Sequence, residues 1–357
     1  MRPTKISELQ ELVRAHSKLS ASGGKTKSAL HNTKDDIKNL DLAGIAGMIE
    51  YNPSEFTFTA RAGTDQEQLS RILGDHEQYL PIDPPFVEQG ATIGGTVASG
   101  LSGPGRFRYG GIRDFIIGIV YVDGQGNLVN SGGKVVKNAA GFDLSKLMVG
   151  SLGRYGALVE CSFKVFPKPE VLKTLRVGFP SLEEALKRLI SISRMPMDLY
   201  ALDIIPRCDQ YFLLMRIGGI QESLLDRIDR LQSVAGDGEL IEGEEEVKTW
   251  RDITDFKWLQ SGELLVKIPV TPKRVVELDR FLSGLSTKRH YSVGCNVAWV
   301  AWRKPIDDLD VQLNKLGLSG LVLVGEVDKI HLGFKRGNQF SKKVKEALDP
   351  EEKWVEV

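Results

Sequence analysis

Residues 22–27 read Ser-Gly-Gly-Lys-Thr-Lys, a combination of residue types that could hold an anion. Two consecutive glycines let neighbouring backbone N–H groups point the same way, and lysine ammonium groups and a threonine hydroxyl follow them. The segment is not a P-loop, because the pattern GxxxxGKS/T is absent, and it is not a dinucleotide fingerprint, because no strand is predicted before it. A helix C-cap followed by a polar turn is the alternative interpretation, and this segment alone leaves both open.

A second segment, residues 90–100, reads GATIGGTVASG and begins a stretch, residues 90–156, that holds nearly half of the 37 glycines. Glycine weakens helices and strands by about 0.5–1 kcal/mol per site, so such density is tolerated where backbone passes very close to something else. Tight turns, bulges and bound cofactors are the usual reasons. The hydroxyls of Thr92, Thr96 and Ser99 beside bare backbone suit a phosphate or the edge of a flavin. The sequence therefore predicts a cofactor cradle lined by backbone.

Three arginines, Arg106, Arg108 and Arg113, alternate with aromatic residues in the next segment. A guanidinium group can hold a carboxylate through two parallel hydrogen bonds, so each arginine is a candidate for binding an acidic substrate. A nucleic-acid-binding loop is the alternative, but Lys plus Arg and Asp plus Glu number 47 each, and the basic footprint of such proteins is absent. No catalytic base stands out among the five histidines, and His331 is expected in a loop or at a strand edge.

Five segments in this order and spacing resemble the FAD-binding domain of the vanillyl-alcohol oxidase/PCMH flavoprotein superfamily. The resemblance is closest to the FAD-binding (E) subunits of bacterial glycolate oxidases. It covers residues 1–170 strongly and the rest weakly. The segments that carry it are DPP at 83–85, GATIGGTVASG, GPGRFRYGGIRDF, VVKNAAGFDLSKLMVGSLG and the closing FKVFPKPE.

The resemblance implies FAD as the cofactor and assigns a part of it to each segment. The first glycine loop, residues 22–27, wraps the pyrophosphate, TIGG lies along the flavin and ribityl, and GPGRFRYG approaches the isoalloxazine. The AGFDL and GSLG stretches, residues 138–143 and 150–153, complete the adenine and phosphate side. The cofactor-binding residues that it implies are Ser22, Gly23, Gly24, Lys25, Thr26, Lys27, Thr92, Ile93, Gly94, Gly95, Thr96, Ser99, Gly103, Tyr109, Gly110, Asn138, Ala140, Gly141, Asp143, Gly150, Ser151 and Gly153. Relatives with covalent FAD often carry histidine in the first glycine loop, and here none occurs before His31, so we expect non-covalent FAD.

The resemblance also implies a function, for which two hypotheses stay open. In the first, the chain is an FAD-binding oxidoreductase subunit of a glycolate oxidase or 2-hydroxy-acid dehydrogenase complex, and passes electrons from a small 2-hydroxy acid through FAD and onward. In the second, it is a structural or electron-relay subunit that carries FAD while a partner chain performs the substrate chemistry. The partners implied are a companion FAD subunit and an iron–sulfur subunit.

The expected fold class is α+β, in two domains. The resemblance implies a PCMH-type FAD-binding domain of two subdomains at residues 1–169 and an FAD-linked oxidase C-terminal domain at residues 170–357. In the second domain, the predicted order strand–helix–strand–strand–helix is typical of a ferredoxin-like unit that covers the first domain as a cap or substrate domain.

Local patterns predict the individual elements. Apolar spacing predicts a first helix over residues 4–19, followed by a turn, and strands are expected near 55–61 and 116–123, the latter in a hairpin. Ser181 and Glu184 form a capping-box pattern at the start of a helix. Thr271 is expected to cap another helix, with Pro272 at its first position. The acidic run 242–246 is expected to be a solvated loop.

The positions of the cysteines and the hydropathy of the sequence bear on metal sites and on the cellular location of the protein. The three cysteines are far apart, so neither a structural zinc site nor an iron–sulfur cluster is expected in this chain. The N-terminus has no apolar core of signal-peptide length, and no segment is apolar enough to span a membrane. We therefore expect a cytoplasmic protein, or one held at the inner membrane through a partner, with no metal and no nucleic-acid partner.

Overall fold

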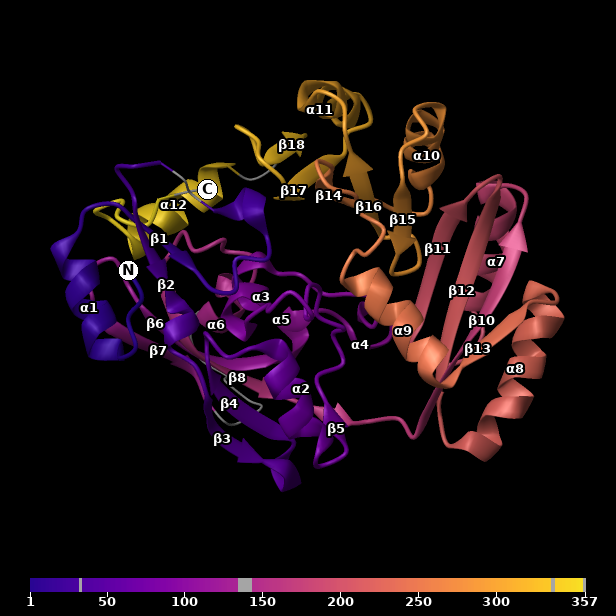
Figure 1. The fold of residues 1–357 in the computed structure, drawn as a ribbon, viewed down its shortest axis with the longest axis horizontal. Helices are drawn as coiled ribbons and strands as arrows, with labels where there is room; N and C mark the ends of the chain where they lie inside the picture. Colours follow the sequence, from indigo (N-terminus) through magenta and orange to yellow (C-terminus); the bar gives the residue numbers. More distant parts are fainter. Residues whose placement is uncertain (32–33, 134–142, 335–337, 356–357) are drawn as a thin grey trace. The chain divides into compact units, whose positions relative to one another are not determined.

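The computed structural model describes residues 1–31, 34–133, 143–334 and 338–355. These residues form two compact units, and neither unit is continuous in sequence. The first contains Met1–Ser102, Gly110–Lys168 and the C-terminal segment with α12 (Asn338–Leu348). The second contains Gly103–Tyr109 and the long stretch that starts at Pro169 (Figure 1). The division into functional domains at 1–169 and 170–357 stays a prediction.

The first unit contains a five-stranded sheet in which all neighbouring strands are antiparallel. Its strands, in spatial order, are β3 (Met48–Asn52), β4 (Thr57–Arg61), β8 (Ala157–Lys164), β6 (Ile116–Val122) and β7 (Leu128–Gly132). The alternation of Phe58 and Ala60 with more exposed residues places one face of β4 in the core. The predicted strand near 55–61 and the predicted hairpin after residue 116 are confirmed.

The N-terminal segment differs from the prediction. Helix α1 spans only Ile6–Ala15, and the chain then enters strand β1 (Leu19–Ser22), which pairs in parallel with β2 (Lys38–Asp41). A strand therefore leads directly into the glycine loop, and the prediction of a helix that continues to residue 19 is wrong. The physical reason is distant packing: Leu19 is fully buried and pairs through its backbone with β2 and with Trp354.

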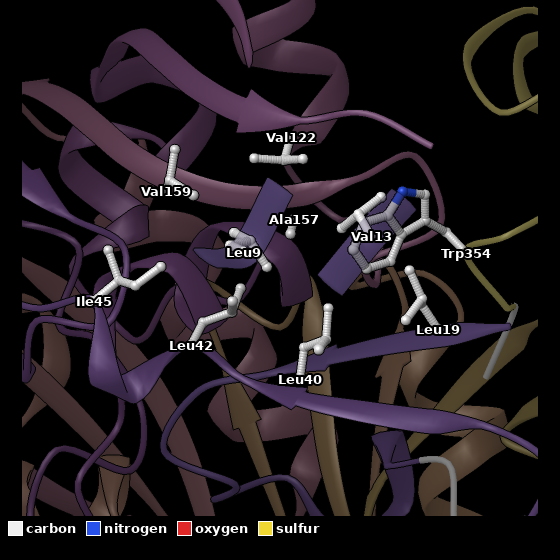
Figure 2. Packing of buried hydrophobic residues seen from close by; sticks show 10 residues of the cluster. All are labelled: Leu9, Val13, Leu19, Leu40, Leu42, Ile45, Val122, Ala157, Val159 and Trp354. Atoms are coloured by element: carbon white, nitrogen blue, oxygen red, sulfur yellow. The ribbon is translucent and has the colours of Figure 1, made fainter. Parts of the chain in front are cut away.

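The C-terminal segment completes the core of the first unit. Figure 2 shows Trp354 beside Val13 and Leu19 in a cluster of buried side chains from both ends of the chain. The segment is held by polar contacts as well: Asp349 Oδ2 accepts a hydrogen bond from the Trp354 N–H at 2.8 Å and lies 2.6 Å from Lys345 Nζ. The unit that contains the glycine loop therefore depends on residues more than 300 positions away in sequence.

The second unit contains a nine-stranded sheet built from two βαββαβ halves. The first half is β10 (Val171–Phe179), α7 (Leu182–Ser193), β11 (Ala201–Arg207), β12 (Gln210–Gly219), α8 (Gln221–Ala235) and β13 (Glu239–Glu242). The second half is β14 (Leu264–Pro269), α10 (Val275–Gly284), β15 (Arg289–Ser292), β16 (Val297–Trp302), α11 (Ile306–Lys315) and β17 (Ser319–Val324), followed by the edge strand β18 (His331–Gly333). In each half the fourth strand lies beside the first, then the third, then the second, and β11 joins β15 through Ile204 and Tyr291. The predicted ferredoxin-like unit is confirmed and occurs twice.

Two local predictions in the second unit are wrong, and one is confirmed. Ser181 caps α7 as expected, accepting the N–H of Glu184 at 3.2 Å. The acidic run is not a solvated loop: it begins α9 (Gly243–Thr254), where Glu246 is fully buried and accepts a hydrogen bond from Arg216 at 2.7 Å. Thr271 does not cap α10, because a turn intervenes and the helix begins at Val275.

Candidate functional site

A cavity in the first unit opens where the glycine loop after β1 meets the start of α3 (Ile93–Ser99) and the loop at residues 151–153. It has a volume of about 760 Å³, counting the part that is open to solvent. The residues predicted from the sequence that line it are Ser22, Gly23, Gly24, Lys25, Thr26, Lys27, Thr92, Gly94, Gly95, Ser99, Ser151 and Gly153. The structure thus brings the glycine loop at residues 22–27 together with residues from two of the five segments, GATIGGTVASG and the one that ends in GSLG, at one cavity.

The glycines around the cavity serve two different purposes. A Cβ on Gly24 would lie 1.8 Å from the carbonyl oxygen of Gly90, and one on Gly23 would lie 2.2 Å from Thr92 Oγ1. A Cβ on Gly94 would lie 2.6 Å from the Ala62 Cβ. These glycines let segments of the protein itself approach one another, which is the tight-turn explanation rather than direct contact with a cofactor.

Gly95 differs from these three glycines. A Cβ there would meet only Thr92 Oγ1, at 3.1 Å, and the residue lines the cavity. The hydroxyls near it belong to the helix: Thr92 Oγ1 accepts the Gly95 N–H at 3.2 Å, and the Ser99 hydroxyl donates to the Gly95 carbonyl at 2.7 Å. A side chain at position 95 would therefore project toward the cavity without disturbing the core.

Lys27 is the most unusual polar residue at the cavity. Its side chain is 8% exposed, and its Nζ contacts the Thr26 hydroxyl at 3.0 Å and lies 5.3 Å from the centre of the Phe86 ring. Burial lowers the pKa of Lys27 to about 8. In the described part of the chain no carboxylate lies within ion-pair distance of Lys27, whereas the exposed Lys25 lies 3.5 Å from Asp41. Buried charges in proteins are normally paired, so Lys27 is suited to an anion from outside the protein.

His31 also lines the cavity, and no pattern in the sequence predicted this position. Burial lowers its pKa, an effect that a hydrogen bond to the Lys25 carbonyl opposes and that the charges of Lys25 and Lys27 strengthen. Its Nε2 is buried and has no hydrogen-bond partner among the described residues. With Nδ1–H on the Lys25 carbonyl, Nε2 of the neutral ring is an acceptor that faces no protein donor.

Further cavity-lining residues were missed because they are small or apolar and carry no chemical signature in the sequence. They are Ala21, Leu30, Leu42, Ala62, Ala98, Leu152, Gly156 and Leu158. Their proximity depends on the pairing of β1 with β2 and on the sheet, which a local pattern does not report.

Other predicted site residues lie elsewhere. Ile93 and Thr96 are buried beneath the cavity, and the Thr96 hydroxyl donates to the Thr92 carbonyl at 3.0 Å. Gly110, Gly150 and Asp143 belong to the first unit but do not line the cavity; Asp143 instead caps α6 (Leu144–Met148). Gly103 and Tyr109 belong to the second unit. Asn138, Ala140 and Gly141 lie outside the described residues.

The three arginines are not equivalent. Arg108, on α4 (Arg106–Tyr109), donates to the Asp198 carbonyl at 2.7 Å and lies 4.6 Å from the centre of the Tyr200 ring, so it is used in holding α4 within the second unit. Arg113 lies in the first unit, where its charge contributes to lowering the pKa of Asp143. Arg106 is exposed and makes no side-chain hydrogen bond or ion pair in the described ranges.

Comparison with known proteins finds relatives of the N-terminal part of the chain. Residues 1–132 match the family model described as an FAD binding domain. This part of the chain is therefore similar to FAD-binding domains. The glycolate oxidase subunit GlcE of Escherichia coli is 41% identical over 165 residues, covering 46% of this chain and 47% of the relative. The glycolate oxidase subunit GlcD of Bacillus subtilis is 32% identical over 145 residues, covering 41% and 31%.

These matches confirm the predicted resemblance and FAD as the cofactor of the domain. The alignments span about half, or less, of the length of these curated relatives. Among solved structures, an alkyldihydroxyacetonephosphate synthase superposes with a TM-score of 0.73 at 13% identity, covering 100% of this chain and 76% of the other. This likeness supports the expected PCMH-type fold followed by an α+β domain.

Lys27, which is buried without an acidic partner among the described residues, and His31 Nε2 fit an anionic, hydrogen-bonding cofactor. No group of three or more potential metal ligands occurs within residues 1–31, 34–133, 143–334 and 338–355. No helix in those ranges is long and apolar enough to cross a bilayer.

Proposed function

We propose that the chain is the FAD-binding subunit of an oxidoreductase that oxidises a small 2-hydroxy acid. The match of residues 1–132 to an FAD-binding domain supports this proposal, as do relatives named glycolate oxidase subunits, D-lactate dehydrogenase and D-2-hydroxyglutarate dehydrogenase. Oxidation of the acid to a 2-oxo acid releases two electrons and two protons; FAD, when bound, accepts the hydride.

The observation that carries the cofactor's placement is Lys27, a desolvated cation at a cavity bounded by glycine loops. The pyrophosphate of FAD lies against residues 22–27, where its charge compensates that of Lys27 and backbone N–H groups donate to its oxygens. His31 Nε2 accepts a hydrogen bond from a hydroxyl or amino group of the cofactor. The FAD is non-covalent.

Roles for the other predicted residues follow the same arrangement. Gly95 and Ser99 lie along the ribityl and flavin, since they line the cavity at the open side of α3. Ser151 and Gly153, which line the cavity, contact the adenine and phosphate side.

A relay role is the second candidate. Among the three arginines, Arg108 is bonded to Asp198, whereas Arg106 and Arg113 make no side-chain hydrogen bond or ion pair with the described residues. His290 is 2% exposed and hydrogen-bonded to Asp203 at 2.7 Å. His331 lies at an edge strand. This sparse set of candidate bases favours substrate chemistry that is completed by a companion FAD subunit and an iron–sulfur subunit, in the cytoplasm or at the inner membrane.

The test is an anaerobic visible spectrum of the purified, FAD-loaded chain before and after addition of glycolate or D-lactate. Bleaching of the flavin by the isolated chain supports the catalytic subunit. Bleaching only after the companion subunits are added supports the relay. A chain that remains colourless when FAD is supplied contradicts both.

A further inference from the structure

The C-terminal segment, residues 338–355, pairs with β1 through a parallel bridge between Leu19 and Trp354. The Leu19 N–H donates to the Lys353 carbonyl at 2.7 Å, and the Val355 N–H donates to the Leu19 carbonyl at 2.9 Å. Leu19 is fully buried, so both of its backbone groups depend on this segment for their hydrogen bonds. β1 continues into the glycine loop that lines the cavity. The C-terminal segment therefore fixes the strand that leads into one wall of the cavity.

A second wall of the cavity is bonded to the same segment through Lys345 on α12. Lys345 is 9% exposed, and its Nζ donates to the Arg154 carbonyl at 2.7 Å and also to the Trp354 carbonyl. The same Nζ donates to the Asp349 carboxylate at 2.6 Å, so all three protons of the ammonium group are used. Arg154 directly follows the cavity loop at residues 151–153. Lys345 thus joins that loop to the stretch that pairs with β1.

Asp349 holds the turn between α12 and this stretch. It is fully buried, its Oδ1 accepts the Lys353 N–H at 3.1 Å, and its Oδ2 accepts the Trp354 N–H at 2.8 Å. A Cβ on Gly124 would lie 2.3 Å from Asp349 Oδ1, so the turn between β6 and β7 closes over the carboxylate. Neither Asp349 nor Lys345 lines the cavity. An effect of either residue on a ligand in the cavity therefore passes through the loops that they hold.

The two cavity loops that meet this segment, residues 22–27 and 151–153, are more than 120 positions apart in sequence. A ligand that contacts both loops binds best when their spacing is fixed before it arrives, because ordering loops on association costs free energy. The C-terminal segment supplies this spacing, since it is bonded to the strand before one loop and to the carbonyl after the other.

We propose that Lys345 is a positioning residue for FAD, and that docking of the C-terminal segment and binding of FAD favour each other. Lys345 fixes the loop at residues 151–153 relative to the glycine loop. The inference rests on the proposed position of FAD in this cavity. By thermodynamic linkage, FAD stabilises the docked segment by the same factor by which docking raises the affinity for FAD.

The first test is FAD titration of the full-length, cofactor-free chain and of its Lys345→Met variant, followed by flavin fluorescence. Methionine has a similar length and donates no hydrogen bond, so the loop loses its bond to the C-terminal segment. The affinity for FAD should fall roughly ten-fold or more, as for the loss of a hydrogen bond to a charged group. Asp349→Asn keeps the shape of its side chain and should weaken FAD binding by a smaller factor. Lys343→Met, at an exposed lysine of the same helix, is the matched control and should bind FAD as the wild type does.

Phe58→Leu separates positioning from a general loss of stability. Phe58 stacks on Phe163 at 5.5 Å within the sheet of the first unit, and neither ring lines the cavity. This variant should lower the midpoint of urea unfolding, because it removes buried apolar contacts, and should keep the affinity for FAD. A loss of affinity that follows the midpoint equally in Phe58→Leu and Lys345→Met would contradict the positioning role.

Hydrogen exchange of the C-terminal segment is a readout that a merely structural lysine would not move. FAD should slow the exchange of backbone amides in residues 345–355 of the wild type, although Lys345, Asp349 and Trp354 do not line the cavity. In Lys345→Met the same amides should be protected less by FAD, whereas in Lys343→Met they should be protected as in the wild type.

Two results would overturn the positioning role while FAD binding itself stands. One is wild-type affinity for FAD in folded Lys345→Met and Asp349→Asn chains. The other is exchange in residues 345–355 that does not change when FAD saturates the wild type. A wild type that binds no FAD is a different outcome, because it contradicts the proposed function and this inference with it.

Discussion

Replacing Lys27 with methionine should stabilise the cofactor-free chain and weaken its binding of FAD. The pKa of Lys27 is lowered from 10.5 to about 8 by burial. Each pKa unit corresponds to about 1.4 kcal/mol, so keeping this lysine charged at pH 7 costs the folded state about 3 kcal/mol. Methionine has similar length and no charge, so the free energy of unfolding of the variant should rise by up to about this amount. The contacts of Lys27 with Thr26 and Phe86 reduce the gain.

The direction of this pKa shift determines how the stability of the folded chain changes with pH. The folded-state pKa of Lys27 lies below the unfolded value, so between pH 8 and 10.5 the unfolded chain binds more protons and stability rises with pH. Below pH 8 the full cost is present. The cofactor-free wild type should therefore gain more stability between pH 7 and 10 than Lys27→Met does. Lys267, which also has a lowered pKa, is unchanged in both proteins and cancels in the comparison.

The assay is urea unfolding of both cofactor-free proteins at pH 7 and pH 10, together with FAD titration followed by flavin fluorescence. Lys27→Met should bind FAD roughly 10- to 100-fold more weakly, the usual cost of losing a hydrogen bond to a charged group. Lys25→Met is the matched control: this lysine is exposed and its ion pair should contribute less than about 1 kcal/mol. A Lys27→Met chain that is less stable than the wild type at pH 7, or that binds FAD equally well, refutes the reasoning.

Three further outcomes follow from the packing. Gly95→Val should lose FAD binding but fold normally, whereas the control Gly74→Val, at an exposed helix end, should keep both FAD binding and stability. Gly94→Ala should lower the melting temperature because its Cβ would contact Ala62. Flavin content and calorimetry check these three variants, and normal flavin content in Gly95→Val would show that the cavity is not the FAD site. Trp354→Ala should lower the free energy of unfolding by about 3–5 kcal/mol, because it removes a fully buried side chain from the core of the first unit. An unchanged midpoint of urea unfolding would show that the C-terminal segment does not stabilise this core. Glu246→Ala should cost about 3–5 kcal/mol by removing the carboxylate that is bonded to the buried Arg216, a loss that replacing a surface glutamate would not cause.

Local periodicity and turn chemistry predicted much of the fold. The alternation in β4, the hairpin after β6 and the Ser181 cap are all decided by residues within a few positions of one another. The duplication of the βαββαβ unit was only partly anticipated, because joining the halves depends on one pairing between Ile204 and Tyr291.

Two of the three errors share a physical cause, which is a packing partner that is distant in sequence. Leu19 belongs to a strand because β2 and Trp354 lie beside it. Glu246 looks like part of a solvated acidic run, but Arg216 on β12 makes it a core residue. The start of α10 was misplaced because Thr271 and Pro272 are followed by a turn before the helix begins.

The candidate site could be predicted in outline but not in its electrostatics. Glycine and hydroxyl patterns identified most of the cavity-lining loops, although Gly23, Gly24 and Gly94 are needed for contacts within the protein. Lys27, on which the proposed position of the cofactor depends, is distinguished by its burial and by the lack of an acidic partner among the described residues. Neither property can be read from the residues beside a lysine in the sequence.

The most direct test of the central claim is the flavin content of the purified chain. Acid precipitation of the full-length protein, supplied with FAD, should release about one FAD per chain into the supernatant, and the Lys27→Met chain should retain less during gel filtration. A wild-type chain that is colourless and leaves added FAD entirely free would contradict the account.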